Sequence, residues 1–595
     1  MANSKVQEQE TYSVLKRYFG YSSFRQGQEE IIDKLLSGQD ILAIMPTGAG
    51  KSLCYQVPAL VMDGITLVIS PLVSLMKDQV NALTAQGIRG AYLNRSLTDK
   101  QFDKALSNMS KGMYKIIYVA PERLTSQRFI NAVMQINISM VAVDEAHCVS
   151  QWGQDFRPGY LNIAQFIADF PKRPVIGAFT ATATSKVKQD IIHLLRLSNP
   201  YEVTTGFDRP NLFFSVFRAY DKQQRLKSLV TANKNKSGII YCSTRKKVEE
   251  VCDYLCEQGF SATRYHAGLR DEERRQNQDD FIYDRKRIIV ATNAFGMGID
   301  KSDVRFVIHH NMPKNLESYY QEAGRAGRDG EYAECTLLWD DDDIRICRYF
   351  ISHMERNEEL TDEQFEIFKQ KEYERLDRMI AYCKTRGCLR SFMLRYFGDN
   401  SKSECSKCSN CLSRKYHTAS STRIHAKPET KPRFQKPSSA LEIAPISKSD
   451  NALYNALLVV RLMIAKKRGV PAYVIFSETS LREMCEKLPV TGKEFLQISG
   501  VTQTKLDRYG EKFMRVIREH IAKKSTKAKD KEKAYSVDKI RASGLTGAYE
   551  KWTNEEVMQL IREYNSGMDI KSIAEIHGRT TGAIRSRLKK ELIID

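Results

Sequence analysis

The chain has 595 residues, a formal net charge of +20 and a hydrophobic fraction of 42%. The length predicts about three to five domains, and the excess of basic residues favours a polyanionic partner, most often nucleic acid. No run of about 18 apolar residues occurs, so we expect no membrane span. The first residues lack a secretory pattern, and the 13 cysteines should stay reduced in a cytosolic protein.

Two series of short apolar runs, separated by helix-like segments, occupy the first 340 residues. Continuous apolar runs with polar carboxyl ends are typical of buried parallel strands. Their alternation with helices predicts an α/β doubly wound sheet, here twice over. The first series is DILAIMP, TLVISP, KIIYVAPE, MVAVDEAH and PVIGAFTATA, and the second is SGIIYCST, RIIVATN, VRFVIHH and ECTLLW.

Changes of composition divide the chain into domains and linkers. We predict α/β domains over residues 1–207 and 208–340, followed by a helical subdomain over 341–412 that ends in cysteines. Small all-α domains are expected over 448–522 and 548–595. The basic stretch at 413–447, rich in Pro, Ser and Thr, and the charged stretch at 523–547 are typical of flexible linkers.

A phosphate-binding loop, MPTGAGKS, follows the first apolar run. Met45 stands where the usual G-x-x-x-x-G-K-[ST] pattern has its first glycine, so a simple turn before a helix is the alternative. The rest of the pattern fits: Lys51 would pair with the β- and γ-phosphates, and Ser52 would ligate Mg²⁺. Glycines let backbone N–H groups close around phosphates. We predict nucleotide contacts from Thr47, Gly48, Ala49, Gly50, Lys51 and Ser52.

Two carboxylates end the run MVAVDEAH. Asp144 would hold Mg²⁺, directly or through water, and Glu145 would polarise the attacking water. A helix N-cap would also use such acids, but the phosphate loop upstream favours catalysis. The segment QEAGRAGRDG (321–330) adds two arginines that suit an arginine finger, in a site split across two domains. The predicted catalytic residues are Lys51, Asp144, Glu145, Arg325 and Arg328.

The segment CSKCSNC supplies Cys405, Cys408 and Cys411. This run needs a fourth ligand to make a closed tetrahedral zinc site. An iron–sulfur cluster is the other interpretation, but the bacterial ferredoxin pattern would need a cysteine where Lys415 stands. The candidates for the fourth ligand are Cys388, Cys383 and His417.

Ten motifs follow one another in the order found in the RecQ family of DNA helicases, within helicase superfamily 2. Each is weak by itself, but together they make the chain resemble that family over about residues 10–412 and most of 448–522. The resemblance implies two tandem RecA-like domains. The motifs are FRQGQ, MPTGAGKS, SPLVSLMKDQ, APERL, DEAH, FTATA, YCSTR, YHAGL, ATNAFGMGID and QEAGRAGRDG.

The resemblance assigns roles that the residue types alone do not. In the family a glutamine motif reads adenine, which stacks on an aromatic ring. Thr180 and Thr182, in FTATA, would link hydrolysis to strand separation. Asp300, in ATNAFGMGID, would lie near the ribose or the water network. The positions that match the adenine-reading residues are Tyr21, Arg25 and Gln28.

The segment SQWGQDFRP is similar to the family's aromatic-rich loop. Trp152 and Phe156 can stack on unpaired bases, each stack contributing roughly 1–3 kcal/mol. Arg157 would contact phosphate or pair with an acid near the nucleotide. Because Glu145 lies just upstream, we hypothesise that base stacking is communicated to the hydrolytic carboxylate. Packing of Trp152 at a domain interface is the alternative.

The resemblance places the fourth zinc ligand at Cys388, giving Cys388, Cys405, Cys408 and Cys411. Residues 448–522 resemble the HRDC domain, which binds DNA or protein in different relatives. Its segment SGVTQTKLDRYG looks like a helix–turn–helix that lets backbone amides approach phosphate. The family usually has a winged-helix domain before HRDC, yet about 35 residues are present here, too few for a domain of about 100 residues.

The last segment, 548–595, is predicted to form three helices separated at Gly567 and at GRTTG. Its final helix is basic, which indicates a helix–turn–helix. A protein-contacting bundle fits the same pattern. The basic residues are Arg585, Arg587, Lys589 and Lys590.

Together these observations predict an ATP-dependent 3′-to-5′ DNA helicase of RecQ type, acting in DNA repair, recombination and the SOS response of the bacterial cytoplasm or nucleoid. ATP, Mg²⁺ and Zn²⁺ would be its cofactors. Single-stranded DNA and tailed or forked duplexes would be its partners, with a single-strand-binding protein or a topoisomerase as protein partners. The alternatives are an RNA helicase with the same motor and a DNA-binding regulator or scaffold that uses the C-terminal helix–turn–helix.

Overall fold

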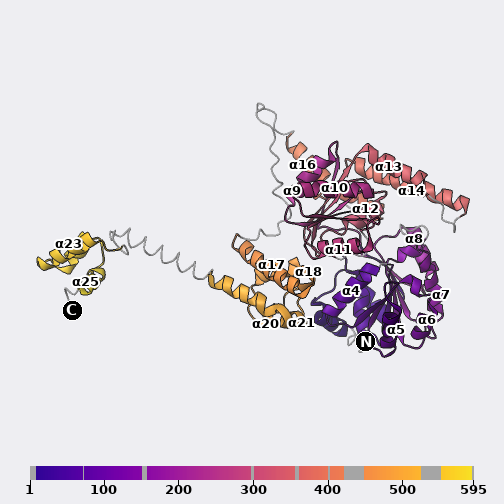
Figure 1. Cartoon of the computed structure of the whole chain (residues 1–595), viewed down its shortest axis with the longest axis horizontal. Coiled ribbons are helices and arrows are strands. Elements are labelled where there is room, and N and C mark those ends of the chain that lie inside the picture. The colour runs from indigo at the N-terminus through magenta and orange to yellow at the C-terminus, as the bar shows by residue number, and fades with distance from the viewer. Residues whose placement is uncertain are drawn as a thin grey trace. The chain divides into compact units, whose positions relative to one another are not determined.

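A computed structural model describes residues 9–71, 73–150, 157–295, 301–354, 361–399, 403–420, 448–523 and 551–591. The chain forms two compact units, Met1–Phe513 and Met514–Asp595 (Figure 1). Among the described residues no helix is long and apolar enough to cross a membrane. The predicted α/β class and the helical C-terminal region are confirmed.

The first lobe is built on a seven-stranded sheet in the order β3-β4-β2-β5-β6-β1-β7. Every neighbouring pair of strands is parallel. The strands are β1 (Ile41–Ile44), β2 (Ile65–Ile69), β3 (Gly90–Leu93), β4 (Ile116–Val119), β5 (Ile138–Val143), β6 (Val175–Thr180) and β7 (Tyr201–Thr204).

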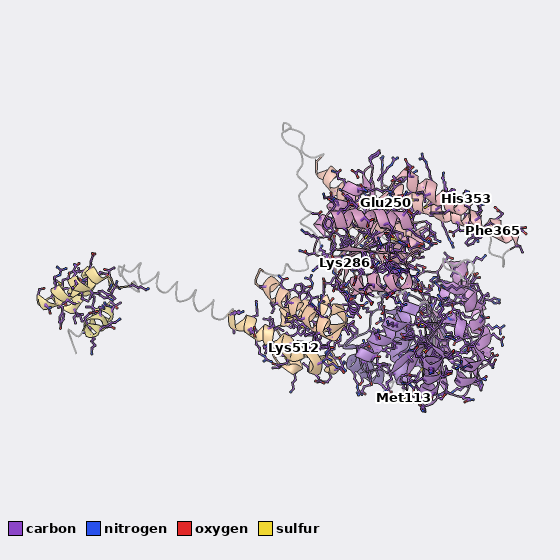
Figure 2. The ribbon with its side chains drawn as sticks, viewed as in Figure 1. Met113, Glu250, Lys286, His353, Phe365 and Lys512 are labelled. Carbon is purple, nitrogen blue, oxygen red and sulfur yellow. The ribbon has the colours of Figure 1, made fainter. Side chains whose placement is uncertain are left out.

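Helices cover both faces of this sheet. The turn η1 (Leu15–Phe19) and helices α2 (Gln28–Leu36), α3 (Lys51–Val61) and α4 (Val73–Ala85) share a core on one face. Helices α5 (Asp99–Ser110), α6 (Gln127–Val133), α7 (Asn162–Ala168) and α8 (Ser185–Leu194) share a core on the other. Short turns η2 (Pro121–Arg123) and η3 (Ala146–Val149) follow strands β4 and β5, and η4 (Pro158–Leu161) leads into α7. Side chains fill both layers (Figure 2).

The second lobe repeats this plan with a six-stranded parallel sheet in the order β10-β11-β9-β12-β13-β8. Its strands are β8 (Leu212–Arg218), β9 (Ser237–Tyr241), β10 (Ala262–Tyr265), β11 (Ile288–Ala291), β12 (Val304–His309) and β13 (Ala333–Trp339). Helices α9 (Lys222–Ala232) and α10 (Arg245–Glu257) pack on one face. Helices α11 (Asp271–Ile282) and α12 (Leu316–Ala323) pack on the other.

The cysteine module (residues 341–420) continues the core of the second lobe. Its first helix begins with a capping box in which Asp340 and Asp343 satisfy each other's backbone N–H groups. An isolated bridge joins Cys408 to Phe214 of β8. The helices are α13 (Asp341–Ser352), α14 (Asp362–Lys384), α15 (Leu389–Tyr396) and α16 (Ser409–Ser420).

A small helical module over residues 448–510 contacts both lobes. Arg482 Nε lies 3.1 Å from the Glu331 carboxylate of the second lobe, and Gly500 N donates to Gly20 O of the first lobe over 3.1 Å. The elements are α17 (Lys448–Arg468), α18 (Ala472–Ile475), α19 (Glu478–Lys487), α20 (Gly492–Phe495), α21 (Gln503–Lys505) and η5 (Leu506–Gly510). The last segment holds α23 (Asn554–Asn565), α24 (Ile570–Ile576) and α25 (Thr581–Lys590).

Sheet order explains where the predicted motifs meet. Strands β1, β6 and β5 are neighbours and all parallel. Their carboxyl ends therefore lie at one edge of the sheet, which is where ligands bind in such folds. The phosphate loop follows β1, FTATA follows β6 and the two carboxylates follow β5.

Candidate active site and metal centre

The phosphate loop requires glycine at two positions. Gly48 and Gly50 have φ of 84° and 86°, a left-handed conformation that residues with a Cβ atom rarely adopt. A Cβ at Gly50 would lie 2.5 Å from Gln28 Nε2, and one at Gly48 would lie 3.0 Å from Arg209 Nη1. Because Gly50 caps α3, the loop leads into a helix N-terminus, where backbone N–H groups favour phosphate.

Residues of the predicted adenine-reading segment hold the phosphate loop. The amide of the buried Gln28 side chain donates to Ala49 O at 3.0 Å and Gly50 O at 3.2 Å. Arg25 donates to Gly48 O at 2.7 Å through its guanidinium and to Gln28 Oε1 at 2.9 Å through its backbone N–H. Gln28 and Arg25 thus lie against the loop that would carry the phosphates.

A cavity of about 400 Å³ joins the sequence-predicted residues of both lobes. Its volume falls within the usual range for small-molecule sites. Ala49 is absent from its lining, and Asp300 lies outside the described residues. The predicted residues that line it are Tyr21, Arg25, Gln28, Thr47, Gly48, Gly50, Lys51, Ser52, Asp144, Glu145, Arg325 and Arg328.

The adjacent carboxylates of Asp144 and Glu145 titrate differently. Burial raises the pKa of Asp144 to about 7, the charge of Glu145 adds to the rise, and Lys51 opposes it. Burial also raises the pKa of Glu145, but the nearby cations Lys51, His147, Arg325 and Arg328 outweigh it and leave that pKa below its ordinary value. Glu145 is therefore ionised at neutral pH, whereas Asp144 needs a cation beside it to stay fully ionised.

A left-handed turn and two hydrogen bonds fix the carboxylates. Glu145 has φ of 48°, and its backbone N–H donates to Asp144 Oδ1 over 3.0 Å. The buried Tyr160 hydroxyl donates to Asp144 O over 2.8 Å. The left-handed backbone at Glu145 and these bonds hold the short segment that carries both carboxylates.

His147 connects the Glu145 carboxylate to the FTATA segment. Its Nδ1 lies 3.4 Å from Glu145 Oε2 and 2.8 Å from Thr180 Oγ1. Thr180 Oγ1 in turn bonds Thr182 O at 3.0 Å. The two threonines predicted to link hydrolysis to strand separation thus lie one histidine away from Glu145.

The arginines of QEAGRAGRDG enter the cavity from the second lobe. Arg325 is 7% exposed, and its Nε has no hydrogen-bond partner among the described residues. Burial lowers the pKa of Arg325, and repulsion from Arg328 lowers it further, while Tyr241, Glu322 and Glu145 act the other way. A buried cation short of partners is suited to receive an anion such as a phosphate group.

Arg209, which the sequence analysis missed, bridges the lobes at the phosphate loop. Its guanidinium donates to Thr47 O of the first lobe and to Gly327 O of the second over 2.8 Å. The neighbouring Arg390, two residues after Cys388, donates to Asp208 and to Arg209 O. The cysteine module therefore holds the segment between the lobes. Arg209 belongs to none of the ten motifs. Its position in the sequence therefore does not indicate that it contacts both lobes.

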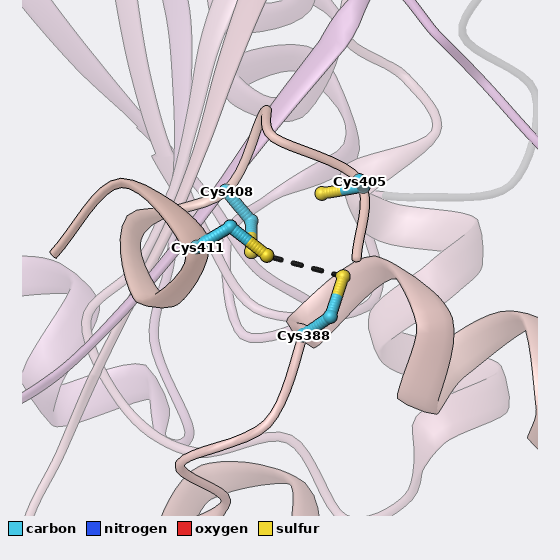
Figure 3. Close-up of side chains that lie close together, drawn as sticks. All are labelled: Cys388, Cys405, Cys408 and Cys411. Atoms are coloured by element: carbon cyan, nitrogen blue, oxygen red, sulfur yellow. Dashed lines mark hydrogen bonds between the residues drawn. The ribbon is translucent and has the colours of Figure 1, made fainter. Parts of the chain in front are cut away.

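Four cysteines form a compact cluster, with ligand atoms all within 4.8 Å of one another (Figure 3). Backbone N–H groups already donate to two of the sulfurs: Ser391 N to Cys388 Sγ at 3.4 Å and Lys407 N to Cys405 Sγ at 3.3 Å. Hydrogen bonding from Cys405 lowers the pKa of Cys408 to about 4. The cluster residues are Cys388, Cys405, Cys408 and Cys411.

Comparisons with known proteins match the chain to four family models. They are DEAD/DEAH box helicase over residues 25–191, helicase conserved C-terminal domain over 221–330, RecQ zinc-binding over 341–412 and HRDC domain over 450–517. The ATP-dependent DNA helicase RecQ of Bacillus subtilis is 37% identical over 587 residues, covering 85% of this chain and 98% of the relative. The Haemophilus influenzae RecQ is 36% identical over 613 residues, covering 87% and 97%.

The chain belongs to the RecQ family of DNA helicases. Like its bacterial relatives it is an ATP-dependent DNA helicase, and DNA is its partner. The RecQ-type motor implies ATP and Mg²⁺, and the glycine cradle, the unsatisfied Arg325 and the high pKa of Asp144 fit an anionic nucleotide with a cation.

The cysteine cluster of this RecQ-family chain binds zinc. Four thiolates with backbone N–H donors are the ligand set of a structural, closed zinc site. Cys383, one of the alternatives for the fourth ligand, lies in the hydrophobic core of the module instead. The side chain of His417 is outside the described residues.

The structure leaves part of the predicted DNA site undescribed. Trp152 and Phe156 lie outside the described residues. Arg157 is described, and its guanidinium donates to Pro71 O over 3.0 Å, beside the SPLVSLMKDQ motif. Its predicted contact with phosphate or an acid stays a prediction.

The HRDC domain meets the RecQ motor beside Tyr21. Gly500, in the turn predicted to approach phosphate, donates its N–H to Gly20 O instead. A Cβ at Gly20 would lie 2.8 Å from Gly500 C, so the two backbones touch. On the second lobe Arg305 pairs with Glu478 at 3.2 Å.

We expect Cys408→Ser to lose zinc and solubility while the ATP site itself stays chemically intact, because a structural metal site is coupled to folding. Metal analysis of the purified parent protein should give one zinc per chain, and the variant should give much less and melt at a lower temperature. Cys383→Ser, outside the cluster, is the matched control and should keep its zinc. Iron with a visible absorption band in the parent protein would contradict the zinc assignment.

Proposed function

We propose that this RecQ-family chain moves 3′ to 5′ along single-stranded DNA and unwinds tailed and forked duplexes in repair and recombination. Hydrolysis of ATP at the cleft between its two lobes would drive the motion. The observation that carries the proposal is the single cavity lined by the phosphate loop, the two carboxylates and the two arginines of the opposite lobe. A site divided in this way can act only when the lobes come together.

Each residue of the cavity has a distinct proposed role. Lys51 supplies a fixed positive charge for the β- and γ-phosphates. Glu145, ionised at neutral pH, accepts a hydrogen bond from the attacking water and orients it toward the γ-phosphorus. Arg325 and Arg328 then neutralise the charge that builds up on the transferred phosphoryl group, which is where the catalytic gain is largest.

A bound Mg²⁺ would neutralise part of the negative charge of the nucleotide phosphates. Ser52 and Asp144 are the residues that would hold it, Asp144 directly or through water. Asp144 fits this role because burial and the charge of Glu145 raise its pKa to about 7 despite the nearby Lys51, so a further cation beside it would keep it ionised.

Two structural links would couple hydrolysis to DNA. His147 joins Glu145 to Thr180, so a shift of the FTATA segment changes the environment of the hydrolytic carboxylate. Arg209 joins the phosphate loop to the turn that carries Arg325 and Arg328. A movement of the loop would therefore be passed on to the turn. The aromatic loop of Trp152 and Phe156 follows η3, the turn that carries His147.

The chain lacks room for the winged helix that the family usually carries. The zinc-binding match ends at residue 412 and the HRDC match begins at 450. The alignment to the Bacillus subtilis relative spans 587 residues, yet covers 85% of this chain and 98% of the relative. The relative therefore has residues within the aligned region that have no counterpart here, which supports the absence of that domain.

The experiment that tests the proposed motor is ATP turnover with single-stranded DNA against single-stranded RNA of the same length and base order. We expect strong stimulation by DNA and little by RNA. Equal stimulation by both would favour the RNA helicase alternative, and turnover that responds to neither would favour a protein whose motor is idle.

We expect Trp152→Ala to uncouple the enzyme. Basal ATP turnover should persist, because the cavity residues are untouched, while stimulation by single-stranded DNA and unwinding both fall. The loss of one base stack, roughly 1–3 kcal/mol, corresponds to a drop of about 5- to 150-fold in DNA affinity. A lower melting temperature with stimulation intact would instead identify Trp152 as a packing residue.

A further inference from the structure

Helices α23, α24 and α25 form a small bundle that no matched family model reaches, since the last match ends at residue 517. Its core consists of Leu560, Ile573, Ala574, Ile584 and Leu588, each 4% exposed or less. The bundle begins with a capping box between Thr553 and Glu556. This core and cap make it a folded module in its own right.

A short turn sets α25 at a fixed angle to α24. Asp569 caps α24 and Thr580 caps α25, and Gly578 has φ of 55° in the turn between them. Two helices joined by a turn of about four residues that contains glycine are the helix–turn–helix arrangement. In that motif the second helix is the one that enters the major groove of DNA.

Buried polar contacts make this turn rigid. The Arg579 side chain is only 3% exposed, lies 3.2 Å from the Glu556 carboxylate and stacks 4.2 Å from the centroid of the Trp552 ring. His577 Nε2 lies 2.8 Å from Glu563 Oε2. A helix held in this way is presented to a ligand without a large cost in conformational entropy.

Charge is distributed unevenly in the module. Residues 576–590 contain five Arg and Lys residues and no acid. Two of the three acids on α23 are engaged inside the module, Glu556 with Arg579 and Glu563 with His577, and Asp569 caps α24. Within α25, Arg587 pairs with the C-cap residue Glu591 at 2.8 Å, whereas Arg585, Lys589 and Lys590 are exposed and available to phosphate.

The outward face of α25 is polar and basic throughout. Thr581, Arg585 and Lys589 recur at intervals of four residues and so lie along one face, while Ile584 and Leu588 point into the core. This face has no large apolar side chain, although a protein-binding helix would need one at its centre. The exposed residues of α25 are Thr581, Gly582, Arg585, Ser586, Lys589 and Lys590.

We propose that α25 is a second DNA site, which binds double-stranded DNA by entering the major groove. Arg585 and the hydroxyls of Thr581 and Ser586 would meet base edges, and Lys589 and Lys590 would contact phosphates. This goes beyond the motor, whose proposed substrate is the single strand. A duplex-binding module on the same chain would raise the local concentration of the motor at a junction between duplex and single strand. Such a module matters in a chain that lacks room for a winged helix.

The test uses the full-length protein and a blunt duplex of about 25 base pairs, a length of roughly two and a half helical turns. Binding is followed by fluorescence anisotropy over a series of salt concentrations. We expect the double substitution Arg585→Gln with Lys589→Gln to weaken duplex binding about tenfold and to reduce the salt slope by about one, the contribution of the phosphate contact of Lys589. The control, Lys551→Gln with Arg562→Gln, removes the same charge from exposed positions of α23 and just before it and should change neither.

A second variant distinguishes binding in the major groove from non-specific electrostatic attraction to DNA. Ser586→Tyr keeps the charge but adds bulk to the exposed face of α25, so it should weaken duplex binding while thermal stability is unchanged. Turnover of ATP with saturating single-stranded DNA should stay at the parental level in all variants. If the parent protein itself showed no such turnover, the proposed motor function would be wrong, and the duplex-binding result for α25 would still stand. Equal weakening in the α25 and control variants, or unchanged duplex binding by Ser586→Tyr, would overturn the proposal.

Discussion

Replacement of Arg328 by alanine is expected to lower ATP turnover about 10³-fold or more while ATP affinity stays within a few-fold of the parent. An arginine finger acts on charge that develops in the transition state, and its removal typically costs a factor of 10³–10⁵. Arg328 lines the cavity from the second lobe, opposite the phosphate loop. Its contribution to ground-state binding should be small because Lys51 and the loop amides already hold the phosphates.

The measurement pairs turnover at saturating DNA with nucleotide affinity from a fluorescent ATP analogue. Arg345→Ala is the matched control, since Arg345 is an arginine of α13 whose side chain is 80% exposed, and it should leave both quantities unchanged. Equal losses of affinity and turnover in Arg328→Ala would assign Arg328 to ground-state binding and remove the finger role.

Glu145→Gln is expected to lower turnover by about 10²–10⁴-fold, the usual loss when a positioned general base is removed. Glutamine keeps the size of the side chain and can still adopt φ near 48°, so the fold and ATP binding should survive. The substitution removes the negative charge of the Glu145 carboxylate, which the surrounding cations keep ionised at neutral pH.

The control for this variant is Glu202→Gln, an exposed acid on the edge strand β7 of the same lobe. Single-turnover measurements would separate the chemical step from product release. If Glu145→Gln hydrolysed ATP at the parental rate in a single turnover, another group would have to position the water.

The strands that could be predicted from the sequence are the inner ones. All nine apolar runs became strands, from β1 and β2 to β13, because inner strands of a parallel sheet are buried on both faces and read as continuous apolar segments. The strands that escaped prediction are β3, β7, β8 and β10, which are the four edges of the two sheets. Edge strands are half-exposed: β7 alternates in burial, and β3 has only Leu93 buried. The short strands β3, β7 and β10 therefore lack a continuous apolar run, whereas β8 (LFFSVFR) is apolar and was missed although most of it is buried.

The nucleotide cavity could be predicted because its residues belong to short motifs at the carboxyl ends of adjacent strands. The roles of Arg209 and Arg390 could not, because each acts through long-range contacts. Arg209 meets Thr47 across 162 positions of sequence, and Arg390 meets Asp208 across 182. No local pattern marks either arginine, and only the packing of the cysteine module beside the segment between the lobes brings them together.

The contact between the HRDC domain and the motor was equally hidden. Lys16 Nζ donates to Leu496 O over 2.9 Å, a bond between residues 480 positions apart. Contacts of this interface go through backbone carbonyl groups, at Leu496 and Gly20. Because every residue has a backbone carbonyl, the amino-acid sequence does not mark these positions. Gly500, in the segment SGVTQTKLDRYG, donates its N–H to Gly20 O of the first lobe over 3.1 Å.

The central claim is that hydrolysis in the divided cavity drives movement along DNA in one direction. Unwinding of duplexes that carry a single-stranded tail at either the 3′ or the 5′ end tests it most directly, with ATP and Mg²⁺ and with Glu145→Gln as the inactive control. We expect the parent protein to separate the 3′-tailed duplex, to leave the 5′-tailed duplex paired, and to do neither without hydrolysis. Separation of both duplexes, or separation by the Glu145→Gln variant, would contradict the account.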